Sequence, residues 1–177
     1  MVSIRSRYVD MGVEQYYRQH AMDYDNPHEE IIRYHLDFRL KNKEIGNLSV
    51  LDLCCGGGEV SKFLTENGII DVEGCDPFTH ELYVQNTDLP CHTFDFKHLA
   101  TKGLDKEYDL IICSFAMHLC PDSMLHTLLY NLSVSCNQLL IITPNKKPFI
   151  DSSSFTFENE VIYNRVYSRL YTSQFAK

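Results

Sequence analysis

The residues with the clearest chemical potential lie in one short segment, Val50–Val60, which reads VLDLCCGGGEV. An apolar run leads into three consecutive glycines, and a helical pattern begins directly after them. Glycine lets the backbone turn sharply and approach a ligand closely, and the N–H groups at a helix start favour negatively polarised ligand atoms. In open parallel sheets, ligands bind at the carboxyl ends of the strands. The segment therefore predicts a ligand-binding loop.

This loop fits the dinucleotide fingerprint G-x-G-x-x-G only in part. Gly56 and Gly58 supply the first two glycines, but the third position is occupied by Ser61. A nicotinamide-dependent oxidoreductase therefore stays an alternative that the pattern weakens. A glycine turn that binds no ligand is a further alternative.

The segment Asp52–Gly58 resembles motif I of class I S-adenosylmethionine-dependent methyltransferases, with Cys54 in place of the first glycine. Later segments resemble the later motifs of these enzymes in the same order. They are Gly74–Phe78 (GCDPF), Phe94–Phe96 (FDF), Tyr108–Leu119 (YDLIICSFAMHL) and Gln138–Pro144 (QLLIITP).

The resemblance implies a role for several residues in binding the methyl donor. Asp76 matches the acid that holds the ribose hydroxyls, Phe78 offers an aromatic face to the adenine, and Asp95 matches the acid at the adenine edge. Asp52 either contributes to the donor site or only orders the glycine loop from behind. The implied donor-binding residues are Asp52, Cys54, Gly56, Gly58, Asp76, Pro77, Phe78, Asp95, Phe96, Ser114, Tyr16 and Tyr24.

The end of the fourth motif, Ser114–His118, concerns the acceptor. It is not the Asn/Asp-Pro-Pro-Tyr/Phe sequence with which amino-group methyltransferases of nucleic acids and of glutamine hold a planar nitrogen, which argues against those substrates. His118 is the candidate base or acceptor-positioning residue. The alternative is that His118 caps the helix expected near Pro121.

Three tyrosines near the N-terminus, Tyr16, Tyr17 and Tyr24, resemble the lid of small-molecule methyltransferases. The resemblance implies that they cover the methionine end of the donor, with Tyr17 a second candidate catalytic residue. The equally weighted alternative is that they pack this segment on the sheet.

Short apolar runs and helical patterns alternate from Ser49 onward. The runs predict strands, and continuous Val/Leu/Ile stretches suit strands buried on both faces. The expected strands are Ser49–Cys55, Ile70–Cys75, Cys91–Phe96, Tyr108–Phe115, Gln138–Thr143, Phe155–Tyr163 and Arg165–Thr172. Apolar residues at helical spacing predict helices over Glu59–Asn67 and Pro121–Leu132, and two more within Tyr8–Asn42, broken at Asn26-Pro27.

This alternation predicts a doubly wound, mostly parallel α/β sheet with an antiparallel C-terminal hairpin at its edge. A length of 177 residues suits one domain, 1–177. Within it we expect a helical N-terminal lid at 1–48, a donor-binding core at 49–144 and closing strands at 145–177.

Composition limits the remaining classes of function. The net charge is −8, and residues 49–144 carry 13 acidic and 4 basic side chains against 3 and 5 in residues 145–177. An acidic average disfavours bulk nucleic-acid binding, but the basic closing strands weaken that argument. The sequence has seven cysteines, an odd number that favours a reducing, cytoplasmic location, and their spacing does not suit a metal site. No apolar stretch is long enough to predict a membrane span.

Three hypotheses follow for the function. The first is a methyltransferase that acts on a small molecule beneath the lid. The second is an RNA or protein methyltransferase that uses a basic–aromatic face, because period-two alternation places Arg165, Tyr167, Arg169 and Tyr171 on one side of the last strand. The third is a non-catalytic donor-binding subunit of a larger complex.

Overall fold

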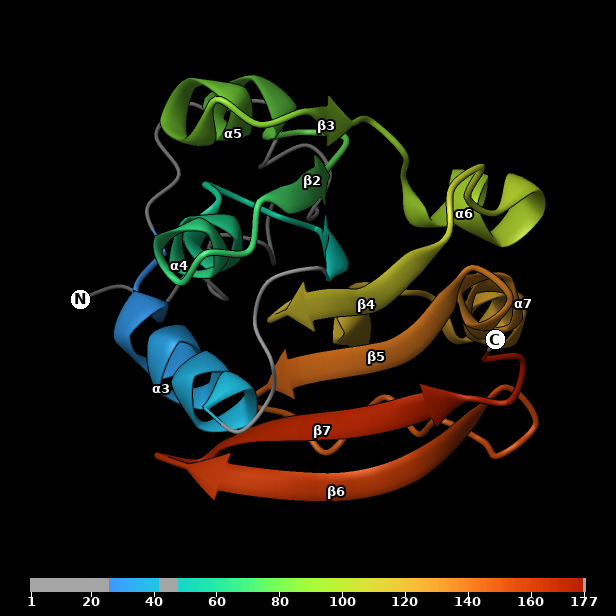
Figure 1. Ribbon diagram of the computed structural model, residues 1–177. Helices are drawn as coiled ribbons and strands as arrows, with labels where there is room; N and C mark the ends of the chain where they lie inside the picture. The colour runs from blue at the N-terminus through green and yellow to red at the C-terminus, as the bar shows by residue number, and fades with distance from the viewer. Residues whose placement is uncertain (1–25, 42–47, 177) are drawn as a thin grey trace, which may run out of the picture.

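The computed structural model describes residues 26–41 and 48–176, which form one seven-stranded sheet in the order β3-β2-β1-β4-β5-β7-β6 (Figure 1). Strands β1 to β5 are parallel, β7 is antiparallel to β5, and β6 is antiparallel to β7. The expected fold class and the antiparallel edge hairpin are therefore confirmed. The strands are β1 Ser49–Leu53, β2 Asp71–Cys75, β3 Cys91–His92, β4 Tyr108–Ser114, β5 Cys136–Thr143, β6 Phe155–Tyr163 and β7 Val166–Ser173.

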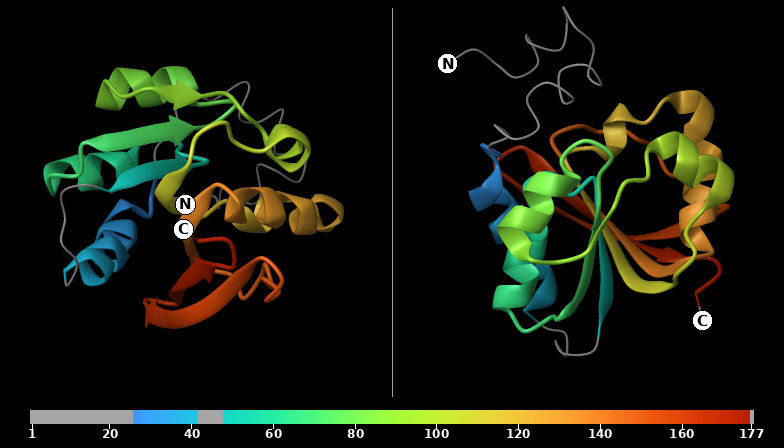
Figure 2. Two further views of the ribbon diagram at one scale, coloured as in Figure 1. Left: turned by 45° about the vertical axis from the view of Figure 1, so that its right-hand side comes forward. Right: turned by 90° about the horizontal axis from the view of Figure 1, so that it is seen from above.

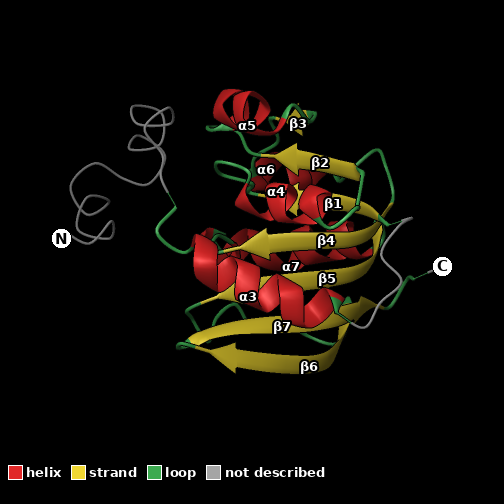
Figure 3. Cartoon of the chain, turned by 60° about the vertical axis from the view of Figure 1, so that its left-hand side comes forward, coloured by secondary structure: helices red, strands yellow, loops and turns green. Residues whose placement is uncertain are grey.

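Helices cover both faces of this sheet (Figures 2 and 3). On one face lie α3 Glu29–Leu40, α4 Glu59–Glu66 and α5 His80–Thr87. On the other lie α6 Phe96–Lys102 and α7 Asp122–Ser133, and a short 3-10 helix, Met117–Leu119, follows β4.

The central strands are apolar along their length because alternate side chains enter two different cores. On β1, Leu51 packs into the core beneath α6 and α7, and its neighbour Val50 packs into the core beneath α3 and α4. On β4, Ile111 and Ile112 divide in the same way, and both are completely buried. Burial on both faces explains the continuous apolar runs of the sequence.

The expected third strand, Cys91–Phe96, is wrong in its second half. Pairing with β2 ends at His92, and α6 begins at Phe96. Asp95 is the N-cap of that helix, and its carboxylate accepts a 2.6 Å hydrogen bond from the main-chain N–H of His98. A capping acid outweighs the apolar alternation here, because it satisfies an N–H that the first helical turn leaves unpaired.

The C-terminal hairpin corrects the expected basic–aromatic face. Arg165 lies in the two-residue turn between β6 and β7 in a left-handed conformation, not in the strand. Arg169 and Tyr171 are only 8% and 5% exposed. Arg169 Nε donates a 2.6 Å hydrogen bond to Glu160 Oε2, so its charge is neutralised across the hairpin. The described residues therefore do not present this set as a surface for nucleic acid.

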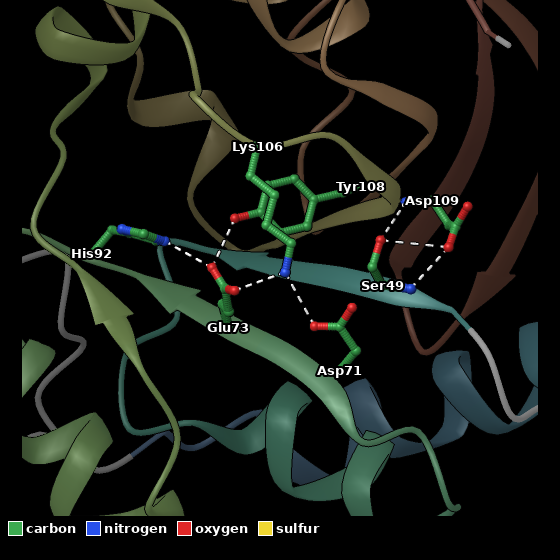
Figure 4. A network of polar contacts seen from close by, with 7 residues as sticks. All are labelled: Ser49, Asp71, Glu73, His92, Lys106, Tyr108 and Asp109. Atoms are coloured by element: carbon green, nitrogen blue, oxygen red, sulfur yellow. Dashed lines mark hydrogen bonds and ion pairs between the residues drawn. The ribbon is translucent and has the colours of Figure 1, made fainter.

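A polar network joins β2, β3 and β4 on the face covered by α6 (Figure 4). Glu73 of β2 accepts hydrogen bonds from Lys106 Nζ at 2.8 Å and from Tyr108 Oη at 2.9 Å, and its Oε2 lies 2.8 Å from His92 Nε2. Burial alone would raise the pKa of Glu73, but these hydrogen bonds outweigh it and lower the pKa to about 2. Glu73 is thus a carboxylate that fixes its three partners.

Candidate donor-binding site

The glycine loop forms at the carboxyl end of β1 as the sequence predicts. Three of its residues, Cys54, Gly56 and Gly58, have left-handed backbone angles. Gly58 is also the N-cap of α4, and a Cβ there would lie 2.5 Å from the side chain of Thr87. Close packing on α5 and the positive φ both require glycine at this position.

Asp52 lies beneath the loop and is fully buried. Its Oδ2 accepts a 2.8 Å hydrogen bond from the Ser61 hydroxyl and a 3.3 Å bond from the Ser61 main-chain N–H. The Ser61 Oγ is also 2.8 Å from the hydroxyl oxygen of Tyr83. Burial raises the pKa of the Asp52 carboxyl well above its usual range. Asp52 is not among the residues that line the adjacent cavity, so this arrangement favours the role of ordering the loop.

Asp76 stands at the carboxyl end of β2, beside the loop. Its Oδ1 accepts hydrogen bonds from the main-chain N–H groups of Phe78 at 2.8 Å and Thr79 at 3.0 Å. Its Oδ2 lies 3.4 Å from the N–H of Gly56. Asp76 is 8% exposed, and the two main-chain hydrogen bonds set the direction of its carboxylate, which is the preorganisation that a ligand-binding carboxylate needs.

A cavity of about 660 Å³ opens at the carboxyl ends of β1, β2 and β4. Ligand pockets commonly have volumes of roughly 300–1,000 Å³, so a nucleoside-sized molecule fits this space. Most of the predicted donor-binding residues are brought together around it. From the β1 and β2 ends these are Cys54, Gly56, Asp76, Pro77 and Phe78, and from the other side Asp95, Phe96 and Ser114.

Two aromatic residues of the cavity wall were not among the predicted site residues, although both lie in segments that resemble the family's motifs. Phe94 lines the cavity from the β3–α6 connection, and Phe115 lines it from the end of β4. Phe115 has a φ of 55° and its ring stacks on His28 with centroids 4.3 Å apart. Backbone strain in a non-glycine residue beside a binding cavity was not visible as a sequence pattern, although such strain often occurs at functional sites.

The structure tests the role of neither candidate catalytic residue. His118 lies in the 3-10 helix after β4, and its neighbours Ala116 and Leu119 line the cavity whereas His118 does not. Its role as a base stays a prediction. Tyr17, together with Tyr16 and Tyr24 of the predicted lid, lies outside the described residues.

Two properties of the described residues bear on the class of site. Within residues 26–41 and 48–176, no group of three or more His, Cys, Asp or Glu side chains is placed to hold a metal ion. In the same part of the chain, none of the helices has the length and apolarity needed to cross a bilayer.

A glycine loop, an oriented acid and a cavity at the strand ends of a doubly wound sheet define a nucleotide-type ligand-binding domain. Comparison with known proteins makes this more specific. A family model described as a methyltransferase domain matches residues 18–170, and the chain belongs to this family. An uncharacterized protein from Schizosaccharomyces pombe is 34% identical over an alignment of 190 positions, which covers 82% of this chain and 76% of that protein.

Solved structures share the fold at low sequence identity. Magnesium protoporphyrin IX methyltransferase from Synechocystis PCC 6803, with bound S-adenosylmethionine, has a TM-score of 0.64 at 17% identity and covers 95% of this chain and 93% of its own. The N-methyltransferase NodS from Bradyrhizobium japonicum WM9, in complex with S-adenosylhomocysteine, has a TM-score of 0.64 at 14% identity over 85% and 89%. A protein from Pyrococcus horikoshii OT3 has a TM-score of 0.68 at 17% identity over 92% and 100%.

Proposed function

We propose that this protein transfers a methyl group from S-adenosylmethionine to a small-molecule acceptor. The observation that carries the proposal is the Asp76 carboxylate, which is buried, oriented by two main-chain N–H groups and set beside the glycine loop at the cavity wall. A carboxylate in this position pairs well with two vicinal ribose hydroxyls. Membership of the methyltransferase-domain family supports the same reaction.

Residues around the cavity suit the parts of this donor. Asp76 would hold the ribose, the main chain at Gly56 would lie against the methionine arm, and the rings of Phe78 and Phe96 would flank the base. Asp95 lines the cavity, but its carboxylate already caps α6. We therefore expect its contact with the base to be secondary to this capping role.

The donor supplies a methyl group bonded to a positively charged sulfur. When the acceptor atom attacks the methyl carbon in line, the carbon–sulfur bond breaks and the sulfur keeps its electron pair. The chain's part is to align the two reactants and to exclude water, which supplies much of the acceleration for such a displacement. A base is required only where the acceptor must lose a proton. His118 is the candidate for that step.

A small-molecule acceptor is favoured over RNA by two observations. The basic–aromatic face expected on the last strand is not presented, since Arg169 and Tyr171 are buried. Among proteins with the same fold, one is named for its action on magnesium protoporphyrin IX, a small molecule. An RNA or protein acceptor, and a role as a non-catalytic subunit, become alternative outcomes of the experiment below.

The test is transfer of radiolabelled methyl from S-adenosylmethionine into a lysate fractionated into small molecules, RNA and protein. We expect counts in the small-molecule fraction, and their loss with Asp76→Ala. Counts confined to RNA or protein would overturn the small-molecule assignment. Donor binding without transfer to any fraction would favour the non-catalytic subunit.

A further inference from the structure

Two cysteine thiols meet beside the glycine loop, outside the cavity. Cys55 is the second residue after β1 and Cys91 is the first residue of β3, and their Sγ atoms lie 3.6 Å apart. Both cysteines are free, and neither is among the residues that line the cavity. In the sheet, β2 lies between β1 and β3, so the thiols connect segments that are one strand apart (Figure 1). The proposed methyl transfer makes no use of this pair.

The surroundings of the two thiols differ. Cys55 is only 3% exposed, whereas Cys91 is half-buried on the strand at the edge of the sheet. Burial raises the pKa of the Cys55 thiol well above its usual range. A small oxidant therefore reaches Cys91 first, while Cys55 stays a protonated thiol beside it.

The pair can close in two steps whose atoms balance. A peroxide oxidises Cys91 to a sulfenic acid: the O–O bond breaks, an S–O bond forms, and the second oxygen leaves as water with the thiol proton. The Cys55 sulfur then attacks the Cys91 sulfur. The S–S bond forms, the S–O bond breaks, and the hydroxyl leaves as water with the Cys55 proton. At 3.6 Å the sulfurs already lie close to the roughly 3–3.5 Å of a near-attack geometry.

Closure of the pair displaces the glycine loop. A disulfide holds its sulfurs at about 2.05 Å, so the two atoms must approach each other by about 1.5 Å. Cys55 directly precedes Gly56, which lines the cavity and whose N–H lies 3.4 Å from Asp76 Oδ2. The carbonyl oxygen of Cys55 also accepts the 2.9 Å hydrogen bond from the Gly58 N–H within the loop. Movement of Cys55 toward β3 therefore disturbs the main chain at the cavity wall.

We propose that Cys55 and Cys91 form a redox site that takes a peroxide as its oxidant, and that their disulfide weakens donor binding by displacing the glycine loop. Disulfides in reducing compartments are usually transient and redox-sensing, which suits a pair that closes only on oxidation. The disulfide itself is independent of the proposed function, whereas its effect on the donor rests on that function.

The first measurement detects the disulfide. The folded chain is treated with hydrogen peroxide, the remaining thiols are blocked in denaturant, and tandem mass spectrometry assigns the linked cysteines. We expect a Cys55–Cys91 disulfide that dithiothreitol reverses and that Cys91→Ser does not form. Cys136→Ala removes a buried cysteine on β5 and is the matched control, which should form the disulfide as the unaltered chain does. A link between other cysteines, or no link, would overturn the redox site.

Dimedone, which traps sulfenic acids, tests the order of the two steps. Cys55→Ala removes the thiol that resolves the sulfenic acid, so the adduct should accumulate on Cys91. In Cys91→Ser we expect no adduct on Cys55, because that thiol is buried and protonated. An adduct on Cys55 in place of Cys91 would overturn the assignment of Cys91 as the residue that the peroxide oxidises.

The effect on the donor is measured by calorimetry of S-adenosylhomocysteine with the reduced and the oxidised chain. We expect the oxidised chain to bind about 5- to 30-fold more weakly, the loss for one or two main-chain hydrogen bonds. Cys91→Ser should bind equally well before and after peroxide, which also controls for oxidised methionines. Equal affinities of the reduced and oxidised unaltered chain would overturn the effect on the loop. No binding by the reduced chain would overturn the proposed function and with it this effect, while the mass spectrum still decides the redox site.

Thermodynamic linkage gives an independent check. If oxidation weakens S-adenosylhomocysteine by a given factor, saturating S-adenosylhomocysteine must shift the thiol–disulfide equilibrium toward the thiols by the same factor. Titration in glutathione redox buffers measures this shift, and a tenfold factor corresponds to about 30 mV. A shift that matches the affinity ratio supports the proposal. An equilibrium that the ligand leaves unchanged would show that the disulfide does not act on the donor site.

Discussion

The hydroxyl of Ser61 donates a 2.8 Å hydrogen bond to the fully buried carboxylate of Asp52, directly beneath the glycine loop. Ser61 stands where a dinucleotide-binding loop has its third glycine. A glycine there lets helix and strand pack closely, whereas this serine ties the start of α4 to β1 by a polar contact. The departure from the fingerprint thus has a structural reason.

Ser61→Ala should lower the free energy of unfolding by about 1–3 kcal/mol, because it leaves the buried Asp52 and Tyr83 oxygens without this partner. Urea unfolding followed by circular dichroism measures the change. Ser152→Ala, at an exposed position, is the control and should stay within about 0.5 kcal/mol. A Ser61→Ala effect as small as that of the control would contradict the account.

Gly58→Ala and Gly57→Ala form a pair that tests the loop geometry. At Gly58 a Cβ meets Thr87 and Tyr83 and the backbone has a φ of 91°, so we expect a loss of stability of about 1–3 kcal/mol and weaker donor binding. At Gly57 the closest neighbour of a Cβ, at 2.7 Å, is the end of the flexible Glu59 side chain, and Asn86 Nδ2 lies at an ordinary contact distance of 3.6 Å. Thermal unfolding with and without S-adenosylhomocysteine should therefore rank Gly58→Ala well below Gly57→Ala, and equal effects would count against this geometry.

His35 on α3 makes the stability of the chain depend on pH. Its side chain is completely buried beside Tyr34 and Tyr163, and burial, followed by the nearby charge of Arg39, lowers its pKa from 6.5 to about 4. The unfolded chain takes up this proton at a higher pH than the folded chain does. Stability should therefore fall as the pH drops from about 6.5 to about 4, by up to about 3 kcal/mol from this group.

The measurement is urea unfolding at several pH values for the unaltered chain and for His35→Phe, which keeps a ring of similar size. The difference between the two should shrink or reverse in favour of the variant as the pH falls. Parallel curves across this range would show that His35 is not buried in its neutral form.

Arg169→Ala should destabilise the hairpin without any effect on nucleic-acid binding. The substitution removes the 2.6 Å bond to Glu160 and the bonds to the carbonyl oxygens of Asn145 and Lys146, which together should cost about 1–3 kcal/mol. Arg165→Ala, in the exposed turn, is the matched control. The prediction is contradicted if the unaltered chain binds RNA at low salt and Arg169→Ala loses this binding, while a variant destabilised elsewhere keeps it. That result would restore the basic–aromatic face as a candidate RNA-binding surface.

The sequence predicted most of the sheet because its strands carry strong local signals. Leu110–Cys113 and Leu139–Ile142 are continuous apolar runs, and both lie in central parallel strands. Helices α5 and α6 were not predicted. Each is only seven or eight residues long and buries few side chains, so neither shows a clear helical period.

Residues of the candidate site that lie in a motif at the end of one strand were predicted, whereas side-chain contacts between different elements were not. Gly56, Asp76 and Phe78 come from two strand ends that the parallel sheet brings together. Phe94 gains its place only through its stacking with His92 and His98, and His92 through Glu73 on another strand. No spacing in the sequence records these pairings.

The central claim is that Asp76 holds a donor in this cavity. Isothermal titration of S-adenosylhomocysteine into the unaltered chain and into Asp76→Asn tests it most directly, since asparagine keeps the size of the side chain but not the charge. We expect one binding site in the unaltered chain and a loss of affinity of about tenfold or more in the variant. Folded protein that gives no binding signal, or an Asp76→Asn variant that binds as tightly as the unaltered chain, would contradict it.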